Sequence, residues 1–372
     1  MKIRFCWVFT DNLIILRNLI FFSKLKVNMQ NQITHPSKLL SDTGSLTQVG
    51  WSPQPMLDSN LEKASFYKLK LFQPFRLKRW DYYGVTTPTH FFSFTISDIG
   101  YLGMVFVYVV DFEKKTHHEE TIAIPFASGV QIPRNSTEGI TSFKNNKASL
   151  MFKKDNSQRS LKVTWKNFQD GMDLSADLIM KDEPEHESMN LVVPIEEKRF
   201  YFNRKINCIP VTGWVEYLDQ KHTITPQHCL ANLDWGRGVW AYDSFWVWAS
   251  SSGFLADGRS IGLNMGFGFG DSSKATENAF ILNGKIQKLE QVKFEYDSKN
   301  FMAPWKMQNE DGRLNLTFTP FYERIAKTDA KILTSEVHQM FGKYNGTLIS
   351  DDGERLSVEN LIGFAEEHHA RW

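Results

Sequence analysis

The stretch HFFSFTISDIGYLGMVFVYVV, residues 90–110, decides the fold. It contains two short runs rich in β-branched and aromatic residues, HFFSFTIS and LGMVFVYVV, with an Asp and Gly between them that favour a turn. Neither run has the apolar period of 3.6 residues that an amphipathic helix needs. The stretch therefore predicts antiparallel strands and disfavours a parallel βαβ arrangement.

Similar runs continue along the chain. A second β-rich block begins near Arg199 with RFYFNRKINCIPVTGWVEYL, and its hairpin-like units end in the turn signals LNGK, EDGR, YNGT and DDGE. Only KATENAF (residues 274–280) and the Thr328–Val337 segment have a helical character. We therefore predict a mainly β protein with two consecutive antiparallel barrel or sandwich lobes, residues 65–200 and 201–372.

Residues 1–64 are predicted to form an N-terminal extension and lead-in segment that is partly disordered, because residues 30–64 lack periodicity. The apolar stretch FCWVFTDNLIILRNLIFF is interrupted by Asp11 and Arg17, which predicts no stable membrane span. Met29 is an alternative start. We expect a cytoplasmic protein, with peripheral membrane association if the residues before Met29 are expressed.

The composition narrows the classes of partner. The formal net charge is +1, from 43 basic and 42 acidic residues, so nothing in the overall charge favours nucleic acid. The three cysteines, Cys6, Cys208 and Cys229, form no CxxC pair, which argues against a disulfide scaffold or zinc ribbon. We predict no cofactor and no metal; the oligomeric state stays open.

Two neighbouring segments, VWAYDSFWVWAS and GLNMGFGFG, predict a hairpin with rings on one strand and nearly bare backbone on the next. The predicted ligand-binding residues are Trp240, Tyr242, Trp246, Trp248, Gly266 and Gly268. The pattern suits a pocket for a flat or elongated apolar molecule. It equally suits a filled barrel interior, in which rings cover glycines on the adjacent strand.

Charged residues near these strands are the candidates for chemistry. The predicted catalytic residues are Asp234, Glu277, Glu367, His368 and His369, and the predicted structural polar cluster consists of Arg237, Asp271 and Arg371. For each of them an ordinary ion pair or a solvated position is the competing interpretation.

The chain ends in AEEHHARW, residues 365–372. In a strand, Glu366 and His368 share one face while Glu367 and His369 share the other. A single histidine then points into any cavity, which disfavours a metal site with two histidines from this segment. We predict an ordered closing strand of the second lobe, with partners such as Asp234 or Arg237 for its charges.

Several motifs carry a resemblance. ANLDWGRGVW, GLNMGFGFGDSSKATENAF and GFAEEHHARW resemble the bacterial DUF2804 family of uncharacterised proteins, and RWDYYGV resembles the N-terminal half of that family. The resemblance covers roughly residues 65–372. More distantly, the chain is similar to two-lobed lipocalin-like proteins, including carotenoid 1,2-hydratases, in which apolar ligands bind between β-barrel lobes. This implies a calycin-like fold but transfers no catalytic residue.

Three functions are compatible with these patterns. The first is a cofactor-independent enzyme that hydrates or isomerises an apolar lipid or isoprenoid-like substrate, with a desolvated carboxylic acid as proton donor and aromatic rings that stabilise a cation. The second is a non-catalytic binding or carrier protein for an apolar ligand. The third is a structural or interaction module.

Overall fold

The computed structural model describes residues 30–66, 72–155, 157–181, 185–329 and 333–372. All elements below belong to the unit Asn31–Trp372. Of the described residues, 65% lie in strands and 2% in helices, which confirms the mainly β prediction. The helices are the short 3-10 turns η1 (Leu61–Lys63) and η3 (Pro74–Arg76). No helix within the described ranges is long and apolar enough to cross a membrane.

The predictions of helical character for residues 274–280 and 328–337 are wrong, because the described residues of both segments contain no helix. KATENAF is irregular up to Asn278 and then enters strand β18 (Ala279–Leu282). Thr328 lies in β22 (Leu314–Asp329) and Val337 in β23 (Thr334–Ile349), while residues 330–332 lie outside the described residues. Long-range strand pairing overrides the weak local preference in both places.

The larger sheet contains thirteen of the described strands. They are β2 (Gly50–Ser52), β4 (Leu77–Thr86), β5 (His90–Asp98), β6 (Leu102–Asp111), β7 (Thr116–Pro125), β8 (Gly139–Lys144), β9 (Ala148–Asp155), β10 (Gln158–Gln169), β11 (Met172–Lys181), β12 (Met189–Glu196), β13 (Arg199–Tyr217), β14 (Gln220–Ile224) and β15 (Leu230–Val239). Its main path runs β7-β6-β5-β4-β15-β13-β11-β10-β9-β8.

Strand β13 joins two parts of this sheet. Residues up to Lys205 pair with β12, whereas residues from Val211 onward pair with β11. Its register with β15 shifts between Ile206 and Ile209, and Cys208 has a positive φ of 59° at that point. This irregularity lets one long strand bend from one set of neighbours to the next.

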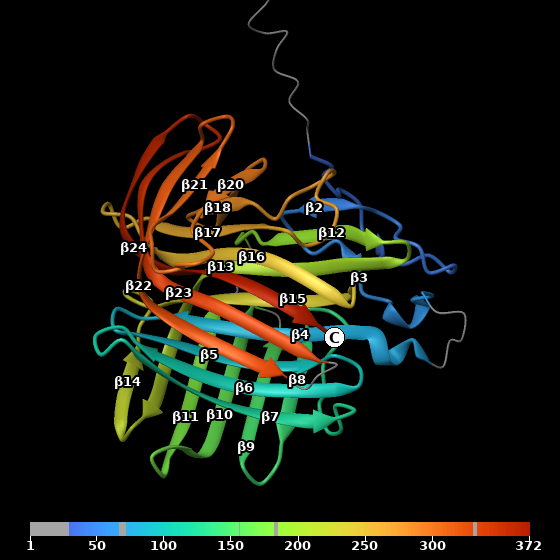
Figure 1. Cartoon of the computed structure of the whole chain (residues 1–372), viewed down its shortest axis with the longest axis horizontal. Coiled ribbons are helices and arrows are strands. Elements are labelled where there is room, and N and C mark those ends of the chain that lie inside the picture. The colour runs from blue at the N-terminus through green and yellow to red at the C-terminus, as the bar shows by residue number, and fades with distance from the viewer. Residues whose placement is uncertain (1–29, 67–71, 156, 182–184, 330–332) are drawn as a thin grey trace, which may run out of the picture. The chain divides into compact units, whose positions relative to one another are not determined.

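The second sheet contains nine of the described strands, in the order β19-β18-β17-β16-β24-β23-β22-β21-β20. Besides β18, β22 and β23 they are β16 (Asp243–Phe254), β17 (Ser260–Phe267), β19 (Lys285–Lys288), β20 (Val292–Glu295), β21 (Trp305–Asn309) and β24 (Arg355–Arg371). Both large sheets are antiparallel and curl into half-barrels, giving two lipocalin-like lobes as predicted (Figure 1).

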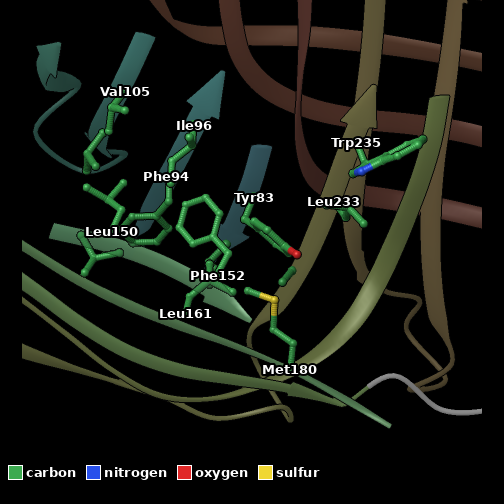
Figure 2. Packing of buried hydrophobic residues seen from close by; sticks show 14 of the residues in the cluster. Tyr83, Phe94, Ile96, Val105, Leu150, Phe152, Leu161, Met180, Leu233 and Trp235 are labelled. Atoms are coloured by element: carbon green, nitrogen blue, oxygen red, sulfur yellow. The ribbon is translucent and has the colours of Figure 1, made fainter. Parts of the chain in front are cut away.

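Each half-barrel encloses its own apolar core. In the first sheet, Figure 2 shows Tyr83, Phe94, Phe152 and Leu233 pointing into a common interior, where the rings of Tyr83 and Phe152 meet edge to face at 5.2 Å. In the second sheet the core includes the fully buried Trp305. Neighbouring residues of a strand face opposite ways, so every second side chain points away from this core and can contact another part of the protein.

The second faces of the two sheets meet each other. Phe91 of β5 contacts Phe341 of β23 and Phe364 of β24, with ring centroids 5.1 and 5.9 Å apart. In Figure 1, β22 to β24, drawn in orange and red, accordingly pass across the cyan β4 and β5. This contact creates the space between the sheets in which the candidate site lies.

The lead-in segment packs onto the first sheet over its described part. Trp51 of β2 pairs with Leu191 of β12, and Leu39 and Leu40 belong to the first core. Strands β1 (Ser37–Lys38) and β3 (Leu57–Asp58) form a small parallel pair. Residues 1–29, including the alternative start Met29, lie outside the described residues.

The change from one sheet to the other falls between Val239, the end of β15, and Asp243, the start of β16. Strands β13, β14 and β15, which follow residue 200, belong to the first sheet. The predicted domain boundary at residue 200 therefore differs from the position at which the chain changes sheets, and it remains a prediction.

The C-terminal segment is an ordered strand. β24 pairs with β16 on one side and β23 on the other, and the ladders reach Arg371. The expected partner of Arg371 is wrong, because its guanidinium bonds Asp243, directly opposite on β16. Adjacency within the sheet thus decides this ion pair.

We predict that deleting residues 366–372 destabilises the second lobe by far more than the roughly 0.5 kcal/mol typical of surface changes, because β24 is an interior strand with a neighbour on each side. Denaturant unfolding of the truncated chain checks this. The double variant Asp243→Ala, Arg371→Ala is the control and should change stability by at most about 1 kcal/mol, since this ion pair is exposed. An unchanged midpoint on truncation contradicts the prediction.

Candidate functional site

A cavity of about 520 Å³ lies between the two sheets. One wall comes from β4, β5, β6, β7, β13 and β15 of the first sheet, and the other from β16, β22, β23 and β24 of the second. Its volume lies within the range of small-molecule binding sites. Ten of the lining residues are tryptophan, tyrosine or phenylalanine, and eight are lysine, arginine, aspartate or glutamate.

Strand register places the polar groups of the first wall in one row. Thr95 of β5 lies opposite Tyr82 of β4, Tyr82 opposite Asp234 of β15, and Asp234 opposite Lys205 of β13. Directly paired residues point to the same face of a sheet. The row therefore presents its side chains to the cavity, while Tyr83 and Leu233 point into the first core.

The second wall has a matching row. Gly266 of β17 lies opposite Trp248 of β16, which lies opposite Glu366 of β24. Glu366 lies opposite Gln339 of β23, and Gln339 opposite Arg324 of β22. Four strands thus bring an indole, a carboxyl, an amide and a guanidinium together from widely separated parts of the chain.

Lys205 and Glu277 form a buried ion pair at the centre of the site. Lys205 Nζ lies 2.7 Å from Glu277 Oε2, and the side chains are 5% and 13% exposed. The same Nζ lies 3.9 Å from the centroid of the Trp248 ring. Glu277 thereby neutralises the lysine, and the indole face adds a cation–π contact.

Arg324 of β22, which is buried, and Glu119 of β7, which is 25% exposed, form a second ion pair. The Arg324 guanidinium also lies 3.9 Å from the centroid of the Tyr108 ring and donates to Gln339 Oε1 at 3.3 Å. Tyr108 donates to the same oxygen at 3.1 Å, and its hydroxyl lies 3.0 Å from that of Tyr82. These bonds connect the two sheets and fix the orientation of the Gln339 amide.

Glu366 is a buried carboxyl that forms no ion pair with any of the described residues. Trp246 Nε1 donates to Oε1 at 3.3 Å and Gln339 Nε2 donates to Oε2 at 3.0 Å. Burial raises the pKa of Glu366 from 4.5 to about 7, against the opposing effects of Trp246 and Arg324. Both neighbours are donors, so neither accepts the proton that Glu366 carries at neutral pH.

Asp234 is the other carboxyl of the cavity without a direct ion pair. Trp80 Nε1 donates to its Oδ2 at 3.2 Å, while Oδ1 is buried and has no hydrogen-bond donor among the described residues. Burial raises its pKa, and Lys205 and Trp80 oppose that rise. Four carboxyls line the cavity, and Lys205 and Arg324 form ion pairs with two of them. For the other two, Asp234 and Glu366, burial raises the pKa.

His368 lines the cavity beside Trp246, with ring centroids 3.9 Å apart. Its Nε2 lies 2.8 Å from the Ser335 hydroxyl. Burial lowers the pKa of His368 to about 3, with His369 and Arg324 adding to the effect. The imidazole is therefore neutral at physiological pH and can act as a hydrogen-bond donor or acceptor.

Three of the four predicted aromatic residues line the cavity and the fourth does not. Trp240, Trp246 and Trp248 line the cavity, and Trp240 lies 4.8 Å from Trp80, centroid to centroid. Tyr242 is not among the lining residues and its side chain is 47% exposed. The hairpin prediction holds for the pairing itself, since Trp248 lies opposite Gly266.

The two predicted glycines leave room for protein side chains. A Cβ on Gly266 would lie 2.3 Å from Glu277 Oε1, and a Cβ on Gly268, whose φ is +91°, would lie 2.7 Å from the Phe245 ring. Neither glycine is among the lining residues. Gly266 thus acts on the cavity indirectly, because its bare backbone lets the Glu277 carboxylate reach Lys205.

The remaining predicted residues lie away from the cavity. Glu367 faces the opposite side of β24, where it accepts hydrogen bonds from Tyr296 and His369. His369 packs its ring against Phe245, 4.9 Å away, and is largely exposed. The alternation predicted for the terminal segment therefore separates Glu366 and His368 from Glu367 and His369.

Arg237, Asp271 and Arg371 do not form one cluster. Arg237 is fully buried beside Asp81 on the inner side of the first sheet. Asp271 lies in an exposed loop and accepts from the backbone N–H of Ser273. Arg371 is the last residue of the interior strand β24, where it pairs with Asp243. The three charged residues therefore lie in three separate parts of the structure.

Sequence reasoning missed several charged groups of the cavity. Lys205 and Lys78 follow the alternation of their strands, RFYFNRK and LKRWDYY, and so lie on the same face as Tyr201 and Trp80. The alternation of side chains along these two strands was the sequence signal that could have identified both lysines.

Within the described ranges no group of three or more His, Cys, Asp or Glu is arranged to hold a metal ion.

The fold and this cavity define a two-lobed lipocalin-like protein with a ligand-sized space between its sheets. The chain belongs to the DUF2804 family, described as a domain of unknown function, whose model matches residues 30–372. The predicted family is thus confirmed.

Two solved structures are similar in fold. Kievitone hydratase from Nectria haematococca is 11% identical, over 79% of this chain and 88% of that chain, with a TM-score of 0.47. A protein assigned as AttH from Nitrosomonas europaea is 10% identical, over 80% of this chain and 92% of that chain, with a TM-score of 0.45. No curated protein matches the sequence.

The pKa of Glu366 predicts a pH-dependent stability. The folded protein releases this proton at a pH of about 7 and the unfolded chain near 4.5, so the stability that the protonated carboxyl provides is present below pH 4.5 and is lost as the pH rises through 7. Compared with the wild type, Glu366→Gln should therefore gain about 3 kcal/mol between a pH of about 4.5 and about 8.

Urea unfolding of both proteins across this pH range measures the effect. Glu354→Gln is the control, because Arg259 holds the pKa of Glu354 below its ordinary value of 4.5. The contribution of Glu354 therefore changes only below a pH of about 4.5, and the difference between this variant and the wild type should stay nearly constant between a pH of about 4.5 and about 8. A constant difference between Glu366→Gln and wild type at every pH contradicts the account of Glu366.

Proposed function

We propose that this protein is a cofactor-independent enzyme that hydrates or isomerises an alkene in an apolar lipid or isoprenoid-like substrate. The observation that carries the proposal is the Glu366 carboxyl, with a pKa of about 7, in a cavity lined by aromatic rings. A carboxylic acid with a pKa close to neutral pH can both give up and regain a proton there, which suits general acid catalysis.

Protonation of the alkene is the first step. Glu366 transfers its proton to one alkene carbon, the π electrons form the new C–H bond, and the neighbouring carbon becomes a cation. Trp246 donates a hydrogen bond to Glu366, and Trp248 lies directly opposite it in the sheet, so two indoles flank the acid. Their faces can stabilise the cation without taking part in bond formation.

The second step decides between hydration and isomerisation. In hydration, a water oxygen bonds to the cation and a water proton passes to a carboxylate, for which Asp234 is the proposed acceptor because Lys205 opposes its neutralisation. In isomerisation, the cation instead loses a different carbon-bound proton to the Asp234 carboxylate, and the electrons of that C–H bond form the new double bond. Return of a proton from Asp234 to Glu366 restores the starting state, and no oxidant or reductant is needed.

His368 is proposed to orient the reacting water. The neutral imidazole lies beside Trp246, next to the acid on the same face of β24, and shares a hydrogen bond with Ser335. Its low pKa makes it a weak base, so positioning rather than proton removal fits it better. Glu277 is proposed to act through its ion pair, which holds Lys205 in place.

Binding or carriage of an apolar ligand without chemistry is the second candidate. The observation that favours it is the lining itself, since a space of about 520 Å³ walled by rings holds an apolar molecule whether or not a proton is transferred. Native mass spectrometry of protein purified from its own host separates the two. A ligand recovered unchanged, together with no conversion of alkenes, supports carriage.

We predict that Glu366→Gln lowers kcat on a converted alkene by at least about 100-fold, because the amide has no acidic proton. Conversion of a lipid and terpenoid panel in ¹⁸O-labelled water, followed by mass spectrometry, measures hydration. Glu367→Gln is the matched control, since the adjacent carboxyl faces the other side of β24, and its kcat should stay within a few-fold. Wild-type kcat in Glu366→Gln, or a panel without any product, overturns the proposal.

A further inference from the structure

One end of the cavity is rich in donors and poor in acceptors. Lys78 of β4 lines this end with only 1% of its surface exposed, and its Nζ donates to the backbone carbonyl of Ile99 at 3.2 Å. The nitrogen lies 4.9 Å from the Tyr101 ring centroid and 5.3 Å from that of Trp372. Among the described residues, no carboxylate lies within ion-pair distance of it. A carbonyl and two rings favour an ammonium group but do not neutralise it.

Two further donors lie at the same end. The indole N–H groups of Trp240 and Trp372 are buried and have no acceptor within the described ranges. Trp372 contacts Lys78, and the Trp240 nitrogen would lie 2.8 Å from a Cβ on Gly238, the residue paired with Lys78. The rings of Trp240 and Trp372 are themselves 5.3 Å apart. Buried donors without acceptors are rare in proteins and indicate a polar partner.

The acid groups lie at a different place along the same strands. Lys78 pairs with Gly238, and four residues further along these strands Tyr82 pairs with Asp234. Four residues of extended chain correspond to about 13 Å. Along its first wall, the cavity therefore has a cationic donor end and, about 13 Å away, the end that holds Asp234 and Lys205. Trp248 of the second wall contacts Lys205 at that end.

We infer that the cavity takes an amphiphilic ligand whose carboxylate binds Lys78 while its apolar chain extends toward Glu366. A carboxylate supplies acceptors for the unpaired N–H groups of Trp240 and Trp372 and a negative charge for the Lys78 ammonium, whose hydrogen bond goes to the uncharged Ile99 carbonyl. The inference deepens the proposed function by naming the end group of the substrate, and it rests on that function only for the position of the alkene.

Charge near Lys78 gives the binding a pH dependence. Burial, assisted by Arg76 of η3 and opposed by Asp98 of β5, lowers the pKa of Lys78 to about 7. Tyr101 meets the ammonium through its ring. A bound carboxylate favours the charged lysine and raises its pKa, so binding takes up a proton. Affinity for the acid should thus fall as the pH rises above 7, whereas affinity for an ester should not.

The test compares a carboxylic acid with its neutral ester. Titration of the full chain with cis-parinaric acid and with its methyl ester, followed through energy transfer from tryptophan, gives both affinities. We expect the acid to bind at least about tenfold more tightly than the ester at neutral pH, as for a charge-assisted contact. In Lys78→Met this preference should drop to about one, with ester affinity kept within about twofold because the apolar walls are intact.

Two further variants keep the test decisive. Lys78→Gln retains a donor for the Ile99 carbonyl and removes only the charge, and it should lose the preference as well. Lys327→Met is the control, because this lysine lies on the same cavity but is paired with Glu336, and the preference should remain. Equal binding of acid and ester by the wild type, or a preference that survives both Lys78 substitutions, overturns the inference.

The outcome is separable from that of the proposed function. Conversion of neutral alkenes by a protein that does not prefer the acid leaves the proposed function standing and removes this inference. A clear acid preference that depends on Lys78, without conversion of any alkene, supports the carboxylate site and removes the enzyme.

Discussion

Desolvation of the charged groups between the two sheets determines which of the cavity carboxyls need a cationic partner and which carry a raised pKa. Folding brings four carboxyls into a space in which water is scarce, and an ionised carboxylate there is costly unless a cation or several donors face it. Lys205 matches Glu277 and Arg324 matches Glu119. Glu366 and Asp234 have no such match, so their pKa values rise. The proposed chemistry follows from this imbalance.

The sequence predicted the features that depend on local alternation. A period of two along residues 90–110 predicted antiparallel strands, and the same period in the last eight residues separated Glu366 and His368 from Glu367 and His369. The hairpin of β16 with β17 followed from a short connection between two strong patterns, whereas the register that places Trp248 opposite Gly266 is seen only in the structure. These predictions succeed because a strand imposes its period of two on every side chain.

Features that depend on distant contacts could not be predicted in this way. The pairing of Lys205 with Glu277 joins β13 to a loop next to β18, and only the folded sheets bring them together. The role of Gly266 as space for Glu277 has the same origin. Arg371 forms a hydrogen bond with its cross-strand neighbour Asp243. KATENAF forms no helix because its last two residues belong to strand β18. The change of sheet after Val239 also depends on how the long strand β13 pairs.

A neutral carboxylic acid at position 366 is the central claim of this account. Carbon-13 NMR of protein labelled at the glutamate side-chain carboxyl, titrated with pH, measures it directly, and Glu366→Gln assigns the signal. The account predicts one glutamate signal that titrates at a pH of about 7 and is absent from the variant. A spectrum in which every glutamate titrates in the ordinary range, near 4.5, would contradict it.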